Sequence, residues 1–225
     1  MPTLRVKQNG IEYYGFYAEP VFDLMGDLGA IVKLFYNAFK SYGVNLASFR
    51  GEGDNQDLAS TAVFVRIPSL GSFRFKFEQI QAISLDFNDE QLGTFFEMLQ
   101  RADEQLRGRL PTLTFRSHMF VYTGHFELLA GTATEFLRGL PNRDIPVPGE
   151  DLGSGISFNW KDPALDAKVA LSIDHSLLIP DGLFVNYRVV LDRDRLDYIP
   201  LAVTAQQLLF GTLASVGLEI ESTNK

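Results

Sequence analysis

The sequence predicts an α+β protein with a curved, mainly antiparallel sheet and amphipathic helices on one face. Short segments in which apolar and polar residues alternate recur along the chain, which is typical of strands covered on one side. Longer segments with apolar residues three or four positions apart lie between them, which is typical of amphipathic helices. The 225 residues, 46% of them hydrophobic, are enough to bury a core, and the 19 phenylalanines favour packing between helices and sheet.

Apolar periodicity and capping residues predict four helices. They cover residues 21–42, a segment that starts at Asn88 and includes Leu106, residues 125–139 and residues 197–216. Asn88 is a good N-cap, and Gln91 stands at the capping-box position. Gly43 and Gly217 are placed to end the first and the last helix, because glycine adopts the left-handed conformation of a helix stop.

Alternation also predicts the strands. They include residues 63–67, 73–77, 83–87, 169–173 and 183–191. Phe73, Phe75 and Phe77 fall on one side of a strand, because side chains alternate with a period of two. Ile83 resumes the same alternation after an interruption, so we expect a bulge or a bend near Ile80.

The two halves of the chain resemble each other. Pro2-Thr3-Leu4 recurs as Pro111-Thr112-Leu113, and at the same offset Tyr13 aligns with Tyr122 and Gly15 with Gly124. Each segment precedes a helix, a hairpin and a second helix. We therefore expect a tandem duplication of a strand-helix-hairpin-helix unit, with repeats at 1–110 and 111–225 that pack together as one compact unit.

Composition limits the compartment and the partners. The chain has no cysteine, which excludes disulfides and thiolate metal sites and favours a reducing, cytoplasmic location. The net charge of −8 argues against nucleic acid or an anionic membrane as a partner and suits a basic protein surface. Residues 198–218 carry no charge, but Gln206 and Gln207 at their centre favour a helix buried in protein over one that spans a membrane.

Catalytic and metal-binding signals are weak. His118 and His125 are seven residues apart, which is not a metal-ligand spacing. The string 172–176 contains serine, aspartate and histidine, but a strand end beside a turn explains it equally well. The acidic, glycine-rich stretches 51–57 and 149–155 have no lysine and do not match a phosphate-binding loop.

Three aspartates are weak candidates for a cation site. Asp192, Asp194 and Asp197 could gather around a hard cation, but Arg193 and Arg195 between them can neutralise the carboxylates. We therefore expect no metal and no cofactor.

The most suggestive feature is an aromatic cluster formed by Tyr13, Tyr14, Phe16 and Tyr17. Because side chains of a strand alternate between its faces, these four cannot all point into one core. At least one is expected to face outward, where it could bind a partner. The alternative is that the cluster packs under the neighbouring helix.

These observations favour a non-catalytic binding protein over an enzyme. The expected role is an adaptor, an inhibitor or an immunity-type protein that binds another, possibly basic, protein through an acidic and aromatic surface, or that forms a homo-oligomer. The alternative is a small-ligand-binding protein or an enzyme with a site between the two lobes, lined by phenylalanine and tyrosine.

Overall fold

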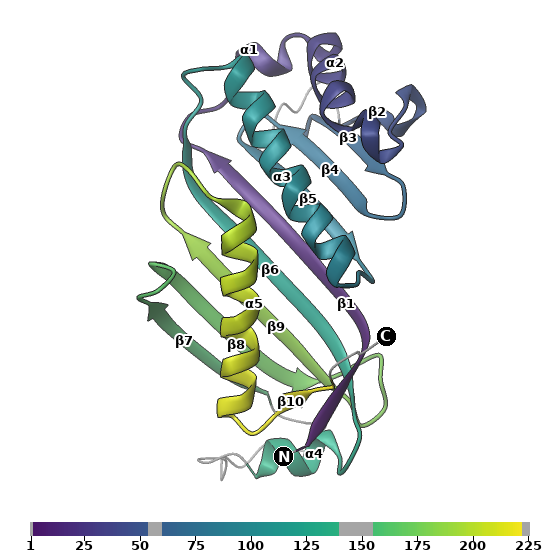
Figure 1. Ribbon diagram of the computed structural model, residues 1–225, viewed down its shortest axis with the longest axis vertical. Helices are drawn as coiled ribbons and strands as arrows, with labels where there is room; N and C mark the ends of the chain where they lie inside the picture. The colour runs from purple at the N-terminus through teal and green to yellow at the C-terminus, as the bar shows by residue number, and fades with distance from the viewer. Residues whose placement is uncertain (1, 54–59, 140–154, 222–225) are drawn as a thin grey trace. The chain divides into compact units, whose positions relative to one another are not determined.

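A computed structural model describes residues 2–53, 60–139 and 155–221 (Figure 1). It has both helices and a large, mainly antiparallel sheet, so the predicted α+β class is confirmed. The chain divides into two compact units, each made from several segments. The α3 unit comprises residues 11–120 and 190–203, and the α5 unit comprises residues 1–10, 121–189 and 204–225.

The elements follow one another along the chain in this order: β1 (Thr3–Tyr17), α1 (Phe22–Met25), α2 (Leu28–Phe39), η1 (Lys40–Tyr42), η2 (Leu46–Ser48), β2 (Phe49–Glu52), β3 (Ala62–Ile67), β4 (Gly71–Lys76), β5 (Gln79–Leu85), α3 (Asp89–Arg109), β6 (Phe115–Leu128), α4 (Ala133–Arg138), β7 (Ile156–Asp162), β8 (Ala167–His175), β9 (Leu183–Leu191), α5 (Tyr198–Ser215) and β10 (Glu219–Ile220).

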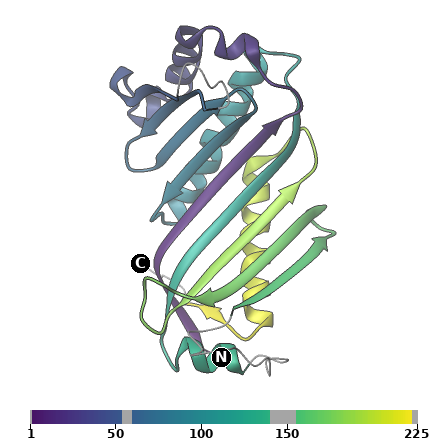
Figure 2. The same ribbon diagram turned by 180° about the vertical axis from the view of Figure 1, so that it is seen from behind.

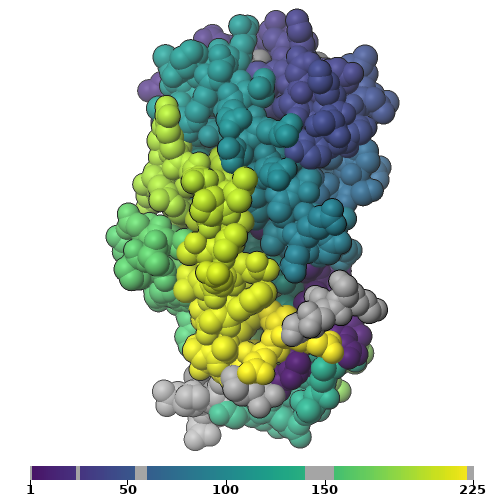
Figure 3. Space-filling view, viewed as in Figure 1, coloured from purple at the N-terminus to yellow at the C-terminus, as the bar shows by residue number. Residues whose placement is uncertain are grey.

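The strands of the α3 unit are hydrogen-bonded in the order β2-β3-β4-β5-β1-β6. Helices α2 and α3 contact each other on one face of this sheet (Figure 1), and the atoms of their segments are adjacent in the space-filling view (Figure 3). Phe35 of α2 stacks on Phe75 with ring centroids 3.4 Å apart, and Phe73 contacts both Phe39 of α2 and Phe95 of α3. Figure 2 shows the opposite face of these strands, over which no described helix passes.

The α5 unit is built from the order β1-β6-β9-β8-β7, and β10 adds to β1 in parallel. Leu171 and Val185 of its strands are fully buried, and Leu209 and Leu213 of α5 are buried with them. Within the described ranges, no helix is both long and apolar enough to cross a membrane.

Capping decides where the predicted helices begin and end. Asn88 and Gln91 form the predicted capping box of α3, and Gly217 has a φ of 86° after α5. The predicted helix at 21–42 is instead divided into α1, α2 and η1, because the Asp27 side chain accepts a hydrogen bond from Ala30 N at 2.9 Å and starts a new helix. The predicted helix at 125–139 is wrong over its first part: β6 continues to Leu128, and only Ala133–Arg138 are helical.

The bend predicted near Ile80 is a tight turn at residues 77 and 78, between β4 and β5. The turn reverses the chain, and residues after it do not keep the parity of Phe73 and Phe75. Ile80 and Ala82 are therefore buried, whereas Leu85 is 63% exposed.

In the described residues each half contains a strand, one or more helices, three or more further strands and a closing helix, whereas the predicted unit had a two-stranded hairpin between its helices. The strand order within the first half is β2-β3-β4-β5-β1, and that within the second is β7-β8-β9-β6, so the first half has an additional edge strand, β2. The two compact units have other boundaries, because β1 and β6 contribute residues to both. The duplication and its repeats at 1–110 and 111–225 stay a prediction that superposition of the halves will test.

Candidate functional site

Strand β1 places its aromatic residues on two faces of the α3 unit. Tyr13 and Tyr17 point into the core and are 1% and 3% exposed. Tyr14 and Phe16 lie on the opposite side and are half-buried. The alternation expected from the sequence is thus present, and a binding role for these four residues stays a proposal.

The outward side chains of six neighbouring strands form one surface, which we call the arginine–aromatic face. It comprises Arg50 of β2, Phe64 of β3, Arg74 of β4, Gln81 of β5, Tyr14 and Phe16 of β1, and Arg116 of β6. The pairing register places Arg50 opposite Phe64, Phe64 opposite Arg74 and Arg74 opposite Gln81. Directly opposed residues of antiparallel strands share a face, so these side chains form a row across the sheet.

Cations and rings alternate along this row. The Arg50 guanidinium lies 4.2 Å from the centroid of the Phe64 ring, and that of Arg74 lies 5.5 Å from it. Glu52 accepts from Arg50 at 2.7 Å and from Arg74 at 2.9 Å, so one carboxylate holds both guanidinium groups beside the ring. The Arg50 side chain is still 63% exposed. Its outer plane therefore faces solvent.

The other end of the row is built around β1. The Tyr14 ring lies nearly parallel to that of Phe16, with centroids 6.2 Å apart, and the Arg116 guanidinium lies 5.9 Å from the Phe16 centroid. Tyr14 donates a hydrogen bond to Glu12. Partial burial and this bond to a carboxylate raise the pKa of Tyr14 to about 12, so its hydroxyl stays a donor at neutral pH.

The strands of the α3 unit carry a positive excess. Their carboxylates are Glu12 and Glu52. Their cationic side chains are Arg50, Arg66, Arg74, Lys76 and Arg116. By the pairing register and the period of two, these cations belong to the face that is turned away from α2 and α3. The chain as a whole has a net charge of −8, so this local balance is opposite in sign to the average.

A buried hydrogen-bond chain lies on the other side of β1. His118 is 0% exposed, and its Nδ1 is 2.8 Å from Tyr13 Oη. Its Nε2 is 3.1 Å from the Asp194 carbonyl oxygen, which can only accept. Nε2 therefore carries the proton, Tyr13 donates to Nδ1, and Tyr198 donates to Tyr13 across 3.0 Å.

Burial keeps the three rings of this hydrogen-bond chain uncharged. Desolvation lowers the pKa of His118 from 6.5 to about 4, so the imidazole is neutral at physiological pH. Desolvation also raises the pKa of Tyr13 and of Tyr198 well above the ordinary value for tyrosine. All three rings stay uncharged near pH 7. The hydrogen bonds connect β1 to β6 and to the first residue of α5.

Arg107 of α3 joins the same network. Its Nε donates to Asp103 at 2.8 Å, and its terminal nitrogens donate to Asp194 Oδ1 at 3.1 Å and to the Asp194 carbonyl at 2.7 Å. Phe115 N also donates to Asp194 Oδ1, at 2.7 Å. Burial opposes ionisation of Asp194, but these donors prevail and hold its pKa below the ordinary value.

The aspartates considered for a cation are not gathered into one site. The Asp194 carboxylate is bound by Arg107 and by a backbone amide. Within the described ranges, no three histidine, aspartate or glutamate side chains are grouped so that they could hold a metal ion. Asp192 and Asp197 thus do not form a cluster with Asp194.

Gly15 makes room for the Tyr13 ring between β1 and its neighbours. A Cβ at this position would lie 2.5 Å from Tyr13 Oη, 2.7 Å from Phe115 Cε1 and 2.9 Å from Ile80 Cγ2. We expect Gly15→Ala to lower the free energy of unfolding by about 1–3 kcal/mol, as overpacked cores do, in a urea titration. Gly93→Ala is the matched control, because a Cβ on that glycine meets nothing within 4 Å. Equal stability of the Gly15 variant and the wild type would contradict this account.

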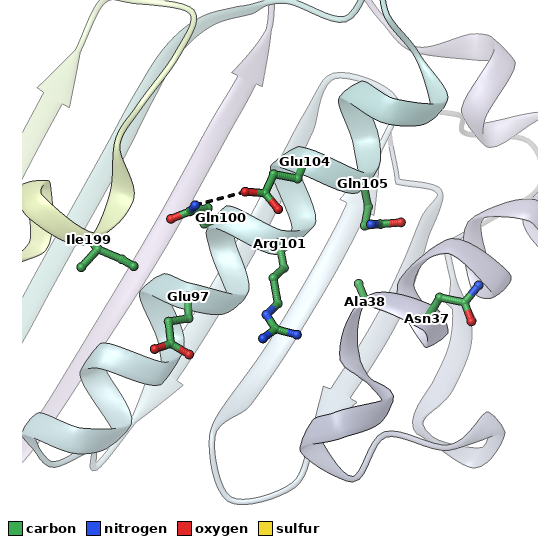
Figure 4. A pocket seen from close by; sticks show the side chains of 8 residues that line it. All are labelled: Asn37, Ala38, Glu97, Gln100, Arg101, Glu104, Gln105 and Ile199. Carbon is green, nitrogen blue, oxygen red and sulfur yellow. Dashed lines mark hydrogen bonds between the residues drawn. The ribbon is translucent and has the colours of Figure 1, made fainter.

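A hollow of about 520 Å³ lies on the helix side of the α3 unit (Figure 4). Its lining comes from α2, α3 and the first turn of α5, and Gln100 donates to Glu104 along α3 at 3.1 Å. The lining is Asn37, Ala38, Glu97, Gln100, Arg101, Glu104, Gln105 and Ile199. It contains no phenylalanine or tyrosine, so it does not match the aromatic-lined site that the sequence led us to consider.

Two other sequence features have structural explanations or lie outside the described ranges. Ser176 Oγ accepts from Leu178 N and Ile179 N and is 2.9 Å from His125 Nδ1, so this serine caps a turn and pairs with a histidine outside the string 172–176. Most of the acidic stretches 51–57 and 149–155 falls outside the described residues.

Comparison with known proteins finds a structural likeness but no match to a family or to a curated sequence. A solved structure of a rolling circle replication initiator protein from Geobacillus stearothermophilus resembles it with a TM-score of 0.38 and 12% sequence identity, over 94% of this chain and 84% of that one.

Two expectations from the sequence are corrected. They are the protein-binding adaptor and the exclusion of nucleic acid as a partner; the solved structure that resembles this chain, that of a replication initiator, agrees with neither. The exclusion rested on the net charge of −8. Net charge sums over the whole chain, whereas a partner meets one face, and the strand face of the α3 unit has more cations than carboxylates.

Proposed function

We propose that this protein binds nucleic acid through the arginine–aromatic face of the α3 unit. The observation that carries the proposal is the gathering of guanidinium groups and half-buried rings on a sheet face that no described helix covers. A cytoplasmic location, as expected from the absence of cysteine, belongs to the same proposal. The proposal includes no catalytic step.

Charge complementarity supports a polyanion as the occupant. Arginine side chains bind phosphate with parallel N–H donors, and their planar groups also stack on rings. Glu52 already holds Arg50 and Arg74 over Phe64. These side chains therefore lose less conformational entropy when a ligand binds. The two carboxylates of the face are occupied by Arg50, Arg74 and Tyr14, which reduces their repulsion of phosphate.

The charge variant Arg50→Gln/Arg116→Gln tests the proposal. Both side chains are exposed at opposite ends of the row, so their loss should spare the fold and remove about two phosphate contacts. We expect affinity for a fluorescent oligonucleotide of about 12 nucleotides to fall about 10-fold or more near 0.1 M salt. The slope of log K against log salt should become shallower by about 2.

The control variant is Lys33→Gln/Lys40→Gln. It removes the same charge from exposed positions on α2 and η1, which belong to the helix side of the α3 unit. Its affinity should be only slightly lower than that of the wild type, because the overall charge of the protein changes. Its salt slope should equal that of the wild type. Equal losses in both variants, or no binding by the wild type at low salt, would overturn the proposed function.

A further inference from the structure

We infer that the arginine–aromatic face accepts a single strand, whose bases stack on Phe64, Tyr14 and the guanidinium groups beside them. This inference rests on the proposed function and specifies its ligand. The observation behind it is that planar side chains follow one another along one row of the sheet. A site that binds only phosphate would need cations but no rings.

The flat groups are held in orientations that suit stacking. The Arg50 guanidinium covers one side of the Phe64 ring and is itself exposed, so a base can stack on its outer plane. Tyr14 and Phe16 lie within 10° of parallel and are half-buried, which limits their movement. The bond from Tyr14 to Glu12 fixes the tilt of that ring further.

The spacing of the row fits several nucleotides. Phe64 lies on β3 and Tyr14 on β1, with β4 and β5 between them. Three strand spacings amount to about 14 Å, which is room for separate bases at the two rings. Gln81, between the rings, has an amide with donors and an acceptor that can bond to base edges.

A duplex fits this face less well. In a duplex the bases are stacked on one another, so their flat sides are not available to a protein ring. The major groove admits a helix or a two-stranded ribbon, but the row here crosses five strands, β2, β3, β4, β5 and β1. A duplex could reach the arginines through its phosphates but not the rings.

The test compares leucine variants with variants that keep a ring. Phe64→Leu and Tyr14→Leu retain apolar volume but lose the flat ring, whereas Phe64→Tyr and Tyr14→Phe keep it. The probes are oligomers of deoxythymidine and of uridine and a DNA duplex, each about 12 nucleotides long. Deoxythymidine and uridine separate DNA from RNA as the source of the strand.

We expect the wild type to bind a single strand about 10-fold or more tightly than the duplex at the same salt concentration. Each leucine variant should lose about 5- to 150-fold in single-strand affinity with an unchanged salt slope, because stacking involves no counterion release. Phe64→Tyr should bind as the wild type does, and Tyr14→Phe should lose much less affinity than Tyr14→Leu, because it keeps the ring and lacks only the hydroxyl that bonds to Glu12. Ultraviolet crosslinking of the wild-type protein, read by mass spectrometry, should attach the strand to β1 or β3, whatever the stability of the variants.

Three outcomes would overturn the inference: equal affinity for duplex and single strand, leucine variants that bind as tightly as the wild type, or crosslinks away from the face. If the Arg50→Gln/Arg116→Gln variant still loses affinity in such a case, the proposed function stands and only the single-strand inference fails. If that variant binds normally as well, both fail.

Discussion

Replacing Arg107 with methionine is expected to lower the free energy of unfolding by about 3–5 kcal/mol, the largest effect of any single substitution considered for this chain. Arg107 donates to Asp103, to the carboxylate and carbonyl of Asp194, and to the Leu113 carbonyl. Its side chain is only 17% exposed. Methionine has similar length and no donor, so it would leave the Asp103 carboxylate, which is 13% exposed, without the donor that binds it, whereas Asp194 keeps the bond from Phe115 N.

A urea titration followed by circular dichroism measures this loss. Arg109→Met is the matched control, because Arg109 is exposed in the same last turn of α3 and should change the stability by no more than about 0.5 kcal/mol. Arg107→Lys should fall between the two, since an ammonium keeps the charge but cannot reproduce the planar fork. A loss below about 1 kcal/mol for Arg107→Met would contradict the network described here.

Local signals explain what the sequence predicted correctly. The capping box of α3 lies within four residues of chain, and Asn88 and Gln91 satisfy each other's backbone amides whatever the rest of the fold does. The same is true of Gly217, whose positive φ ends α5. The two faces of β1 follow from the period of two, which needs no knowledge of the neighbouring strands.

The errors arose where a local pattern had two solutions. Phe126 fits a helix by spacing, but it is fully buried in β6, and the helix starts only after Thr132 can cap it. The turn at residues 77 and 78 reverses the parity of β5, which alternation alone cannot reveal. In both cases tertiary packing selected one of two arrangements that the sequence allowed.

The arginine–aromatic face could not be predicted from the sequence. Arg50, Phe64, Arg74 and Gln81 have no fixed spacing along the chain, and only the strand register aligns them. The aromatic pair on β1 was the one part with a sequence signal. The net charge argued against nucleic acid because carboxylates outnumber cations in the rest of the chain by more than the positive excess of this face.

Acidification is expected to destabilise the protein between about pH 6.5 and pH 4 because of His118. In the folded state burial lowers its pKa to about 4, while in the unfolded state it has the ordinary value of 6.5. Within this window the unfolded state binds a proton that the folded state does not, so stability falls as the pH falls and levels off below about pH 4. The contribution of this one group is about 3 kcal/mol.

The charged groups around His118 modify this dependence. Burial raises the pKa of Asp103 above its ordinary value, so the folded state takes up a proton there more readily, which opposes the loss as the pH falls. The pKa of Asp194 is lowered, which adds to the loss at the acid end. Arg107 keeps its charge throughout, and its position lowers the pKa of His118 further.

Urea titrations of the wild type and of His118→Phe at several pH values between 4 and 7.5 separate the histidine from these neighbours. The variant will be less stable at pH 7, because Tyr13 Oη and the Asp194 carbonyl lose a partner, so the informative quantity is the slope of stability against pH. Between pH 6.5 and pH 4 that slope should be clearly shallower in the variant, since Asp103 and Asp194 act in both proteins.

In the wild type, the ring signals of His118 in an NMR titration should stay those of a neutral imidazole with a proton on Nε2 until the pH approaches 4. Equal slopes in the two proteins, or protonation of His118 near pH 6.5 without unfolding, would show that the buried hydrogen-bond chain does not hold this histidine neutral.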